Sequence, residues 1–153
     1  MSHIIPTPLF EKTDETKRLL IKSLSLDERN VNGSVKDDFY DFIRKLELPV
    51  GNDVVVSFTH DFSLENEEYR LEVNEKITVY SSGEAGKVFA LQTLKQLLFE
   101  YGRTIPFIAI KDKPKYKIRG FMLDVGRYFY PVDDVKLFIR KMSLHKLNFL
   151  HLH

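Results

Sequence analysis

The last 35 residues constrain the fold of this chain more than any other segment. Residues 120–125 form a short apolar run between Arg119 and Gly126, which is typical of a strand buried on both faces. After Pro131, apolar residues recur at helical spacing, and residues 148–153 then form a second strand of the buried type. A strand, a helix and a strand in this order predict a βαβ unit with two parallel strands.

This unit is expected to be incomplete by itself. A pair of parallel apolar strands leaves an unpaired edge and apolar faces open, and the chain ends inside the second strand. We therefore expect further residues after His153. Without them, residues 121–125 and 149–152 are expected to drive self-association or strand exchange between copies, or to pack against the rest of the chain.

The preceding residues predict an α+β fold, an antiparallel sheet with helices on one face. Residues 34–47 have apolar side chains at helical spacing, and we expect Ser34 to cap this helix together with Asp37. A second capping box, Ser81-Ser82-Gly83-Glu84, predicts a helix that runs to about Glu100 and stops at Gly102.

Alternating apolar residues predict the strands of this sheet. Residues 54–59 form one strand, and residues 68–80 form a hairpin that turns at Asn74-Glu75. Weaker patterns around Phe10 and over Leu19–Leu26 predict one or two more strands.

A lysine-rich segment, KDKPKYK at residues 111–117, separates the two patterns. Its Pro114 marks the boundary, so the sequence predicts two domains, residues 1–113 and 114–153. The lysines could form a basic contact patch or a solvated connector. The net charge of +1 favours the connector and gives no reason to expect nucleic acid or a membrane surface as a partner.

Composition excludes several other classes of protein. The chain has no cysteine, which rules out disulfides, thiolate metal sites and a thiol nucleophile. No apolar stretch approaches the roughly 20 residues of a membrane-spanning helix. The first residues also lack the basic and apolar regions of a signal peptide.

Two segments resemble family 20 glycoside hydrolases, most of which are β-N-acetylhexosaminidases. Residues 67–98 are similar to the end of the small, zincin-like α+β accessory domain of that family. Residues 119–153 are similar to the opening β-α-β of its catalytic (β/α)8 barrel, with the pattern RGxxLDxxR, then a helix, then KxNxxHxH. The resemblance implies a complete accessory domain followed by a truncated barrel.

The resemblance implies one substrate-binding residue in this chain, Arg127. In the family, the arginine that closes the first barrel strand hydrogen-bonds hydroxyls of the terminal sugar, and a planar guanidinium suits two vicinal hydroxyls. The carboxyl end of a barrel strand is also where active sites lie. The alternative is an arginine that only caps a surface turn. Tyr128 departs from the family, which often has histidine there, and Arg119 at the other end of the strand is expected to be structural.

Three further residues are candidates for supporting roles. Asp124 is expected near the core, either as a structural carboxylate or as a residue that holds a neighbouring side chain. His151 and His153 lie two apart on one strand and therefore share a face. This spacing also suits zinc, but no third ligand is nearby, and the resemblance instead makes both histidines part of the active-site floor. No metal and no cofactor are expected.

The resemblance places the catalytic residues outside this chain. In the family an adjacent Asp-Glu pair lies about a hundred residues further on, and the substrate's own acetamido oxygen attacks the anomeric carbon. Two acidic pairs here, Glu67-Glu68 and Asp133-Asp134, are expected to be solvated or to favour a helix dipole. The 153 residues alone are therefore expected to be inactive.

These observations lead to one main hypothesis and two alternatives. The parent protein is expected to hydrolyse terminal N-acetylhexosamine from oligosaccharides, in the periplasm or outside a bacterial cell if a signal peptide has been removed. The first alternative is a non-catalytic module for carbohydrate binding or assembly. The second is a metal-dependent hydrolase that uses His151 and His153.

Overall fold

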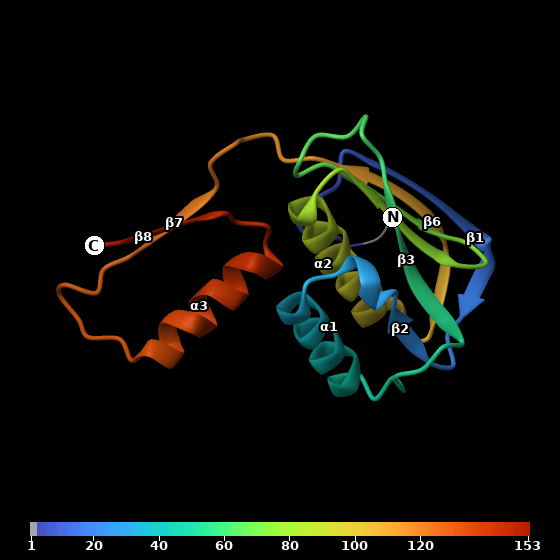
Figure 1. Ribbon diagram of the computed structural model, residues 1–153, viewed down its shortest axis with the longest axis horizontal. Coiled ribbons are helices and arrows are strands. Elements are labelled where there is room, and N and C mark those ends of the chain that lie inside the picture. Colours follow the sequence, from blue (N-terminus) through green and yellow to red (C-terminus); the bar gives the residue numbers. More distant parts are fainter. Residues whose placement is uncertain (1–2) are drawn as a thin grey trace. The chain divides into compact units, whose positions relative to one another are not determined.

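The structure, a computed structural model, describes residues 3–153 and divides into two compact units between Lys113 and Pro114. The N-terminal unit is a six-stranded sheet with two helices on one face (Figure 1). In spatial order its strands are β1 (Phe10–Leu20), β6 (Thr104–Asp112), β4 (Tyr69–Val73), β5 (Ile77–Ser81), β3 (Val54–His60) and β2 (Leu24–Leu26).

This arrangement confirms the predicted α+β class. The pairs β1–β6, β6–β4 and β4–β5 are antiparallel, whereas β5–β3 and β3–β2 are parallel. The predicted hairpin is present, with Val73 opposite Ile77. The helices are α1 (Gly33–Lys45) and α2 (Glu84–Tyr101), and a short 3-10 helix, η1 (Glu28–Asn30), precedes α1.

Both predicted capping boxes are wrong in detail. Asn32 caps α1, and its side chain accepts a hydrogen bond from the Ser34 amide at 3.1 Å. Helix α2 starts after Gly83 without a side-chain cap, and the Ser82 hydroxyl instead donates to the Glu65 carbonyl. Ser, Asn and Asp side chains compete for amides at a helix start, so the residue whose backbone is extended becomes the cap.

Strand β6 is the element that the sequence did not predict, because Pro106 argues against an inner strand. In the structure β6 lies between β1 and β4. Pro106 is opposite Arg18, at the point where the register of β1 shifts between Asp14 and Arg18. A bulge interrupts the ladder of hydrogen bonds, so a residue without an amide proton fits there.

The core of the N-terminal unit lies between the sheet and helix α2. Leu71 and Val79 from the sheet and Leu91, Leu94 and Leu98 from α2 are all buried. Helix α1 adds Phe39 and Ile43, which are also fully buried. Gly102, at φ 63°, ends α2 as expected, since this backbone conformation favours glycine.

The C-terminal unit is the predicted βαβ motif. Strands β7 (Gly120–Leu123) and β8 (Phe149–Leu152) pair in parallel, and α3 (Val132–Leu144) connects them. The prediction that both strands are buried on two faces is wrong for this chain, because Leu123 is the single buried residue of the two strands. Their burial depends on neighbours that these residues do not supply. Within the described residues, no helix is long and apolar enough to span a membrane.

Candidate functional site at the end of strand β7

The candidate site is the loop that follows β7, at the carboxyl end of the parallel pair. Main-chain hydrogen bonds from β8 hold its first residues. The His153 amide donates to the Leu123 carbonyl at 3.0 Å, and the His153 carbonyl accepts from Val125 at 3.0 Å and Gly126 at 2.9 Å. The end of β8 therefore fixes where the loop begins.

The side chain of Asp124 also organises the loop. Its Oδ1 atom accepts hydrogen bonds from the Gly126 amide at 3.1 Å and from the Arg127 amide at 3.0 Å. Its Oδ2 atom lies 3.3 Å from Arg127 Nε. The Asp124 side chain is 26% exposed and the Arg127 side chain is 87% exposed. The structure thus brings together two of the predicted site residues, and leaves the guanidinium open to solvent.

Three aromatic residues follow this arginine in the sequence. Tyr128 and Phe129 are exposed, and the Tyr128 ring meets the Tyr130 ring edge-on at 5.2 Å. Tyr130 in turn contacts Phe138 of α3, with ring centroids 6.4 Å apart. The loop therefore carries one cation followed by three aromatic residues.

The two histidines lie on β8 and directly after it, beside the candidate site. His151 and His153 are exposed, and their rings meet edge-on with centroids 6.2 Å apart. The described residues contain no group of three or more His, Cys, Asp or Glu that could hold a metal ion. The main chain of His153 holds the loop after β7, a role that the sequence did not indicate.

Arg119 lies at the opposite end of β7. Its Nε atom donates to the Lys146 carbonyl at 2.8 Å and its Nη1 atom to the Tyr116 carbonyl at 2.7 Å. The Asn148 side chain accepts from the Arg119 amide at 3.0 Å. These contacts connect the start of β7 to the start of β8, so Arg119 has a structural role.

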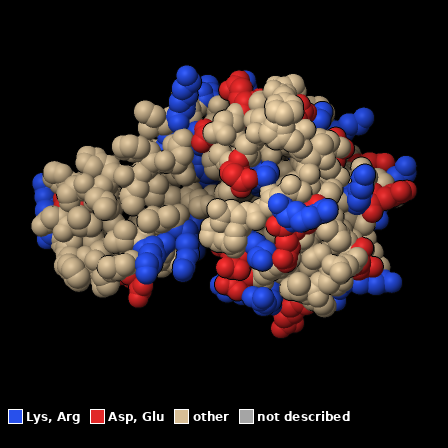
Figure 2. All heavy atoms as spheres, in the orientation of Figure 1, with Lys and Arg blue, Asp and Glu red and all other residues tan. Residues whose placement is uncertain are grey.

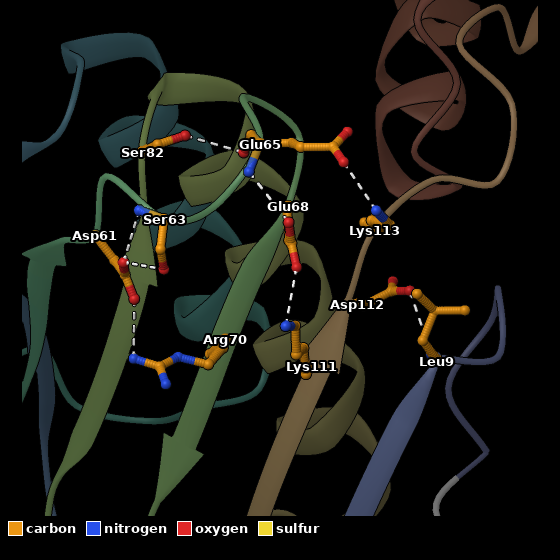
Figure 3. A network of polar contacts seen from close by, with 10 residues as sticks. All are labelled: Leu9, Asp61, Ser63, Glu65, Glu68, Arg70, Ser82, Lys111, Asp112 and Lys113. Atoms are coloured by element: carbon orange, nitrogen blue, oxygen red, sulfur yellow. Dashed lines mark hydrogen bonds and ion pairs between the residues drawn. The ribbon is translucent and has the colours of Figure 1, made fainter.

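A second polar cluster lies in the N-terminal unit, around the loop between β3 and β4 (Figure 3). Lys111 pairs with Glu68 at 3.2 Å, and Lys113 pairs with Glu65 at 2.8 Å. Two predictions are thereby corrected. Residues 111 and 112 belong to β6 rather than to a linker, and Glu68 is buried rather than solvated.

Burial alone would raise the pKa of Glu68. The hydrogen bond from the Glu65 amide and the Lys111 ammonium outweigh it, so the pKa lies below its usual 4.5. The pKa of Asp61 is also lowered, chiefly by hydrogen bonds from the Ser63 hydroxyl and amide, and Arg70 lies 3.1 Å away. Each carboxylate has a partner that stabilises its charged form, as expected for a structural network.

Another buried polar group of the N-terminal unit is the Tyr69 hydroxyl. It lies 2.6 Å from the Thr93 hydroxyl and donates to Asp112 Oδ2 at 3.3 Å. Burial, with the nearby Asp112 carboxylate, raises the pKa of Tyr69. This cluster links strands β4 and β6 to helix α2 inside the core.

Comparison with known proteins assigns both units to one family. Residues 3–113 match the model of glycosyl hydrolase family 20, domain 2, and residues 116–153 match the model of the catalytic domain of the same family. A beta-N-acetylhexosaminidase from Cellulomonas fimi is 38% identical over 104 residues, which cover 65% of this chain and 21% of that protein. N,N'-diacetylchitobiase from Vibrio harveyi is 26% identical over 98% of this chain and 18% of its own length.

Solved structures agree with this assignment. An exo beta-N-acetylglucosaminidase from Vibrio harveyi, in complex with N-acetylglucosamine, has a TM-score of 0.81 and 25% identity over 100% of this chain and 26% of its own. The N-acetyl-beta-hexosaminidase from Streptomyces plicatus has a TM-score of 0.79 and 27% identity. The match covers 98% of this chain and 34% of that protein's chain. The chain spans about a fifth of the length of the curated relatives that it matches. Because a family model covers residues 3–113, and a second model of the same family covers residues 116–153, this chain belongs to glycosyl hydrolase family 20.

Proposed function

We propose that the protein containing this chain is a β-N-acetylhexosaminidase, which removes terminal N-acetylhexosamine from glycans. The observation that carries this proposal is the match of both units, in order, to two domains of one glycoside hydrolase family. The names of the relatives support the reaction, and the Vibrio harveyi complex supports N-acetylglucosamine as a ligand.

Within this chain, we assign the binding of the terminal sugar to Arg127. Its exposed guanidinium is at the carboxyl end of β7, where barrel enzymes bind their substrates. It carries a permanent charge and a fixed fork of donors, which suits two neighbouring hydroxyls of one sugar ring. Residues 1–113 then serve as the accessory domain, and residues 114–153 as part of the catalytic barrel.

The chemistry itself is assigned to residues outside this chain. Family 20 enzymes use the acetamido group of the substrate as the nucleophile. One carboxylate of the enzyme orients and stabilises that group, and the other protonates the leaving glycosidic oxygen and later activates water. The chain does contain two Asp-Glu dipeptides, at residues 14–15 and 27–28, but both lie in the N-terminal unit. Their carboxylates already have partners: Thr16 and Arg18 for the first, Arg29 and Lys36 for the second.

Substrate discrimination tests this proposal. The protein encoded by the complete reading frame should hydrolyse a chromogenic N-acetyl-β-glucosaminide or N-acetyl-β-galactosaminide. It should leave the matching β-glucoside intact, because that sugar lacks the acetamido nucleophile. Equal turnover of both sugars, or none of either, would overturn the proposal. The 153-residue chain should turn over neither substrate.

A further inference from the structure

We propose that Asp124 is a positioning residue for Arg127, acting on both the backbone and the side chain of the arginine. This inference rests on the proposed function, because it assigns the sugar to Arg127. It goes further by stating what holds the arginine in place before the sugar binds.

The backbone contribution comes from Asp124 Oδ1. One oxygen accepts from two successive amides, those of Gly126 and Arg127, at 3.1 and 3.0 Å. Aspartate closes such turns readily because its short side chain reaches amides two or three residues further along the chain. The His153 carbonyl accepts from the Val125 amide and shares the Gly126 amide with Asp124. The main chain that leads into Arg127 is therefore held by two acceptors, the Asp124 carboxylate and the His153 carbonyl.

The side-chain contribution comes from Asp124 Oδ2. It lies 3.3 Å from Arg127 Nε, which is the guanidinium nitrogen nearest the main chain. This contact restrains the side chain through Nε and leaves the two terminal nitrogens for a ligand. An exposed ion pair of this kind adds little to the stability of the fold, so its expected effect is a modest bias of the arginine toward one orientation.

Such pre-ordering matters because arginine loses much rotamer freedom when it is held in one geometry. A carboxylate that restrains it in the unbound protein reduces the entropy that the sugar must otherwise offset. Asp124 never needs to touch the sugar. Its effect on catalysis should pass entirely through Arg127.

A double-mutant cycle on the complete protein tests this dependence, with a chromogenic N-acetylglucosaminide as the substrate. Asp124→Asn keeps an oxygen for the two amides but removes the charge that faces Arg127, so it should fold. It should lower kcat/KM about tenfold when Arg127 is present and less than about twofold when Arg127→Ala is also present. Asp133→Asn is the matched control, because Asp133 is 95% exposed and lies in the same unit.

The outcomes separate this inference from the proposed function. An active protein in which Asp124→Asn has the same effect with and without Arg127→Ala overturns the positioning role alone. An inactive wild-type protein overturns the proposed function, and the positioning role falls with it. If Asp124→Asn changes kcat/KM no more than Asp133→Asn does, the positioning role is likewise overturned. Loss of activity that depends on Arg127 supports it.

Discussion

The two units use similar ingredients, apolar strands and an amphipathic helix, but differ in how much they bury. In the N-terminal unit, Leu71, Ile77 and Leu94 are each 0% exposed. In the C-terminal unit, Met122 and Phe149 on the paired strands are 56% and 54% exposed. Figure 2 shows the same contrast: acidic and basic side chains are interspersed over the visible face of the N-terminal unit, whereas that of the C-terminal unit is largely uncharged. An apolar pattern indicates which side chains can be buried. Whether they are buried depends on the elements that pack against them.

The largest difference between the two units is expected when one apolar side chain is truncated in each. Leu94→Ala should lower the free energy of unfolding of the 153-residue chain by about 2–5 kcal/mol, since it leaves a cavity in a closed core. Met122→Ala should cost less than about 1 kcal/mol, because the side chain is half exposed already. Urea unfolding followed by circular dichroism measures both. Equal costs would mean that the two units are equally well packed.

A second contrast concerns hydroxyl groups. Tyr69→Phe should destabilise the chain by about 1–3 kcal/mol, because it removes the hydroxyl that pairs with the buried Thr93 hydroxyl and donates to Asp112 Oδ2. Tyr116→Phe, an exposed position in the C-terminal unit, should change the urea midpoint very little. A neutral Tyr69→Phe would show that the buried cluster does not stabilise the fold.

A third test concerns the start of helix α1. Asn32→Ala should cost about 1 kcal/mol, because the Ser34 amide loses its acceptor. Ser34→Ala should cost less, since in the structure Ser34 is not the cap. The reverse order in urea unfolding would restore the capping box that the sequence predicts.

The smallest expected effect is a pH dependence at Glu68. Its pKa is lowered in the folded protein, so its charged form contributes stability above 4.5, and that stability is lost as the pH falls through the folded pKa. Glu68→Gln should therefore be less stable than wild type near neutral pH, and the difference should shrink below pH 4.5. Glu75→Gln, at an exposed turn, is the control. A difference that does not change with pH would contradict the ion-pair account.

Much of the fold follows from local patterns. The hairpin at Asn74-Glu75, helix α2 and the elements of the βαβ unit are all predicted by spacing, because each carries its apolar periodicity within a short segment of sequence. Strand β6 is not, because Pro106 is acceptable there only opposite a bulge in β1, a strand far away in the sequence. The burial of Glu68 has the same origin: its partner Lys111 is on β6.

The candidate site also has a part that the sequence predicts and a part that it does not. The RGxxLDxxR pattern points to Arg127. The sequence also predicts Asp124 near the core, whereas the structure has it directly after β7 with its side chain 26% exposed. The main chain of His153 could not be predicted, since it reaches Val125 and Gly126 only through the pairing of β7 with β8. Short-range signals thus identify the residues of the loop, and long-range pairing fixes their positions.

The most direct test of the account compares two exposed arginines, one from each unit, in the protein encoded by the complete reading frame. Arg127→Ala should lower kcat/KM for a chromogenic N-acetylglucosaminide by about 100-fold or more, the cost of losing charged hydrogen bonds to the sugar. Arg29→Ala removes an arginine that is 86% exposed and pairs with Asp27, and should change kcat/KM less than about twofold. If Arg127→Ala is as harmless as Arg29→Ala, Arg127 does not bind the terminal sugar.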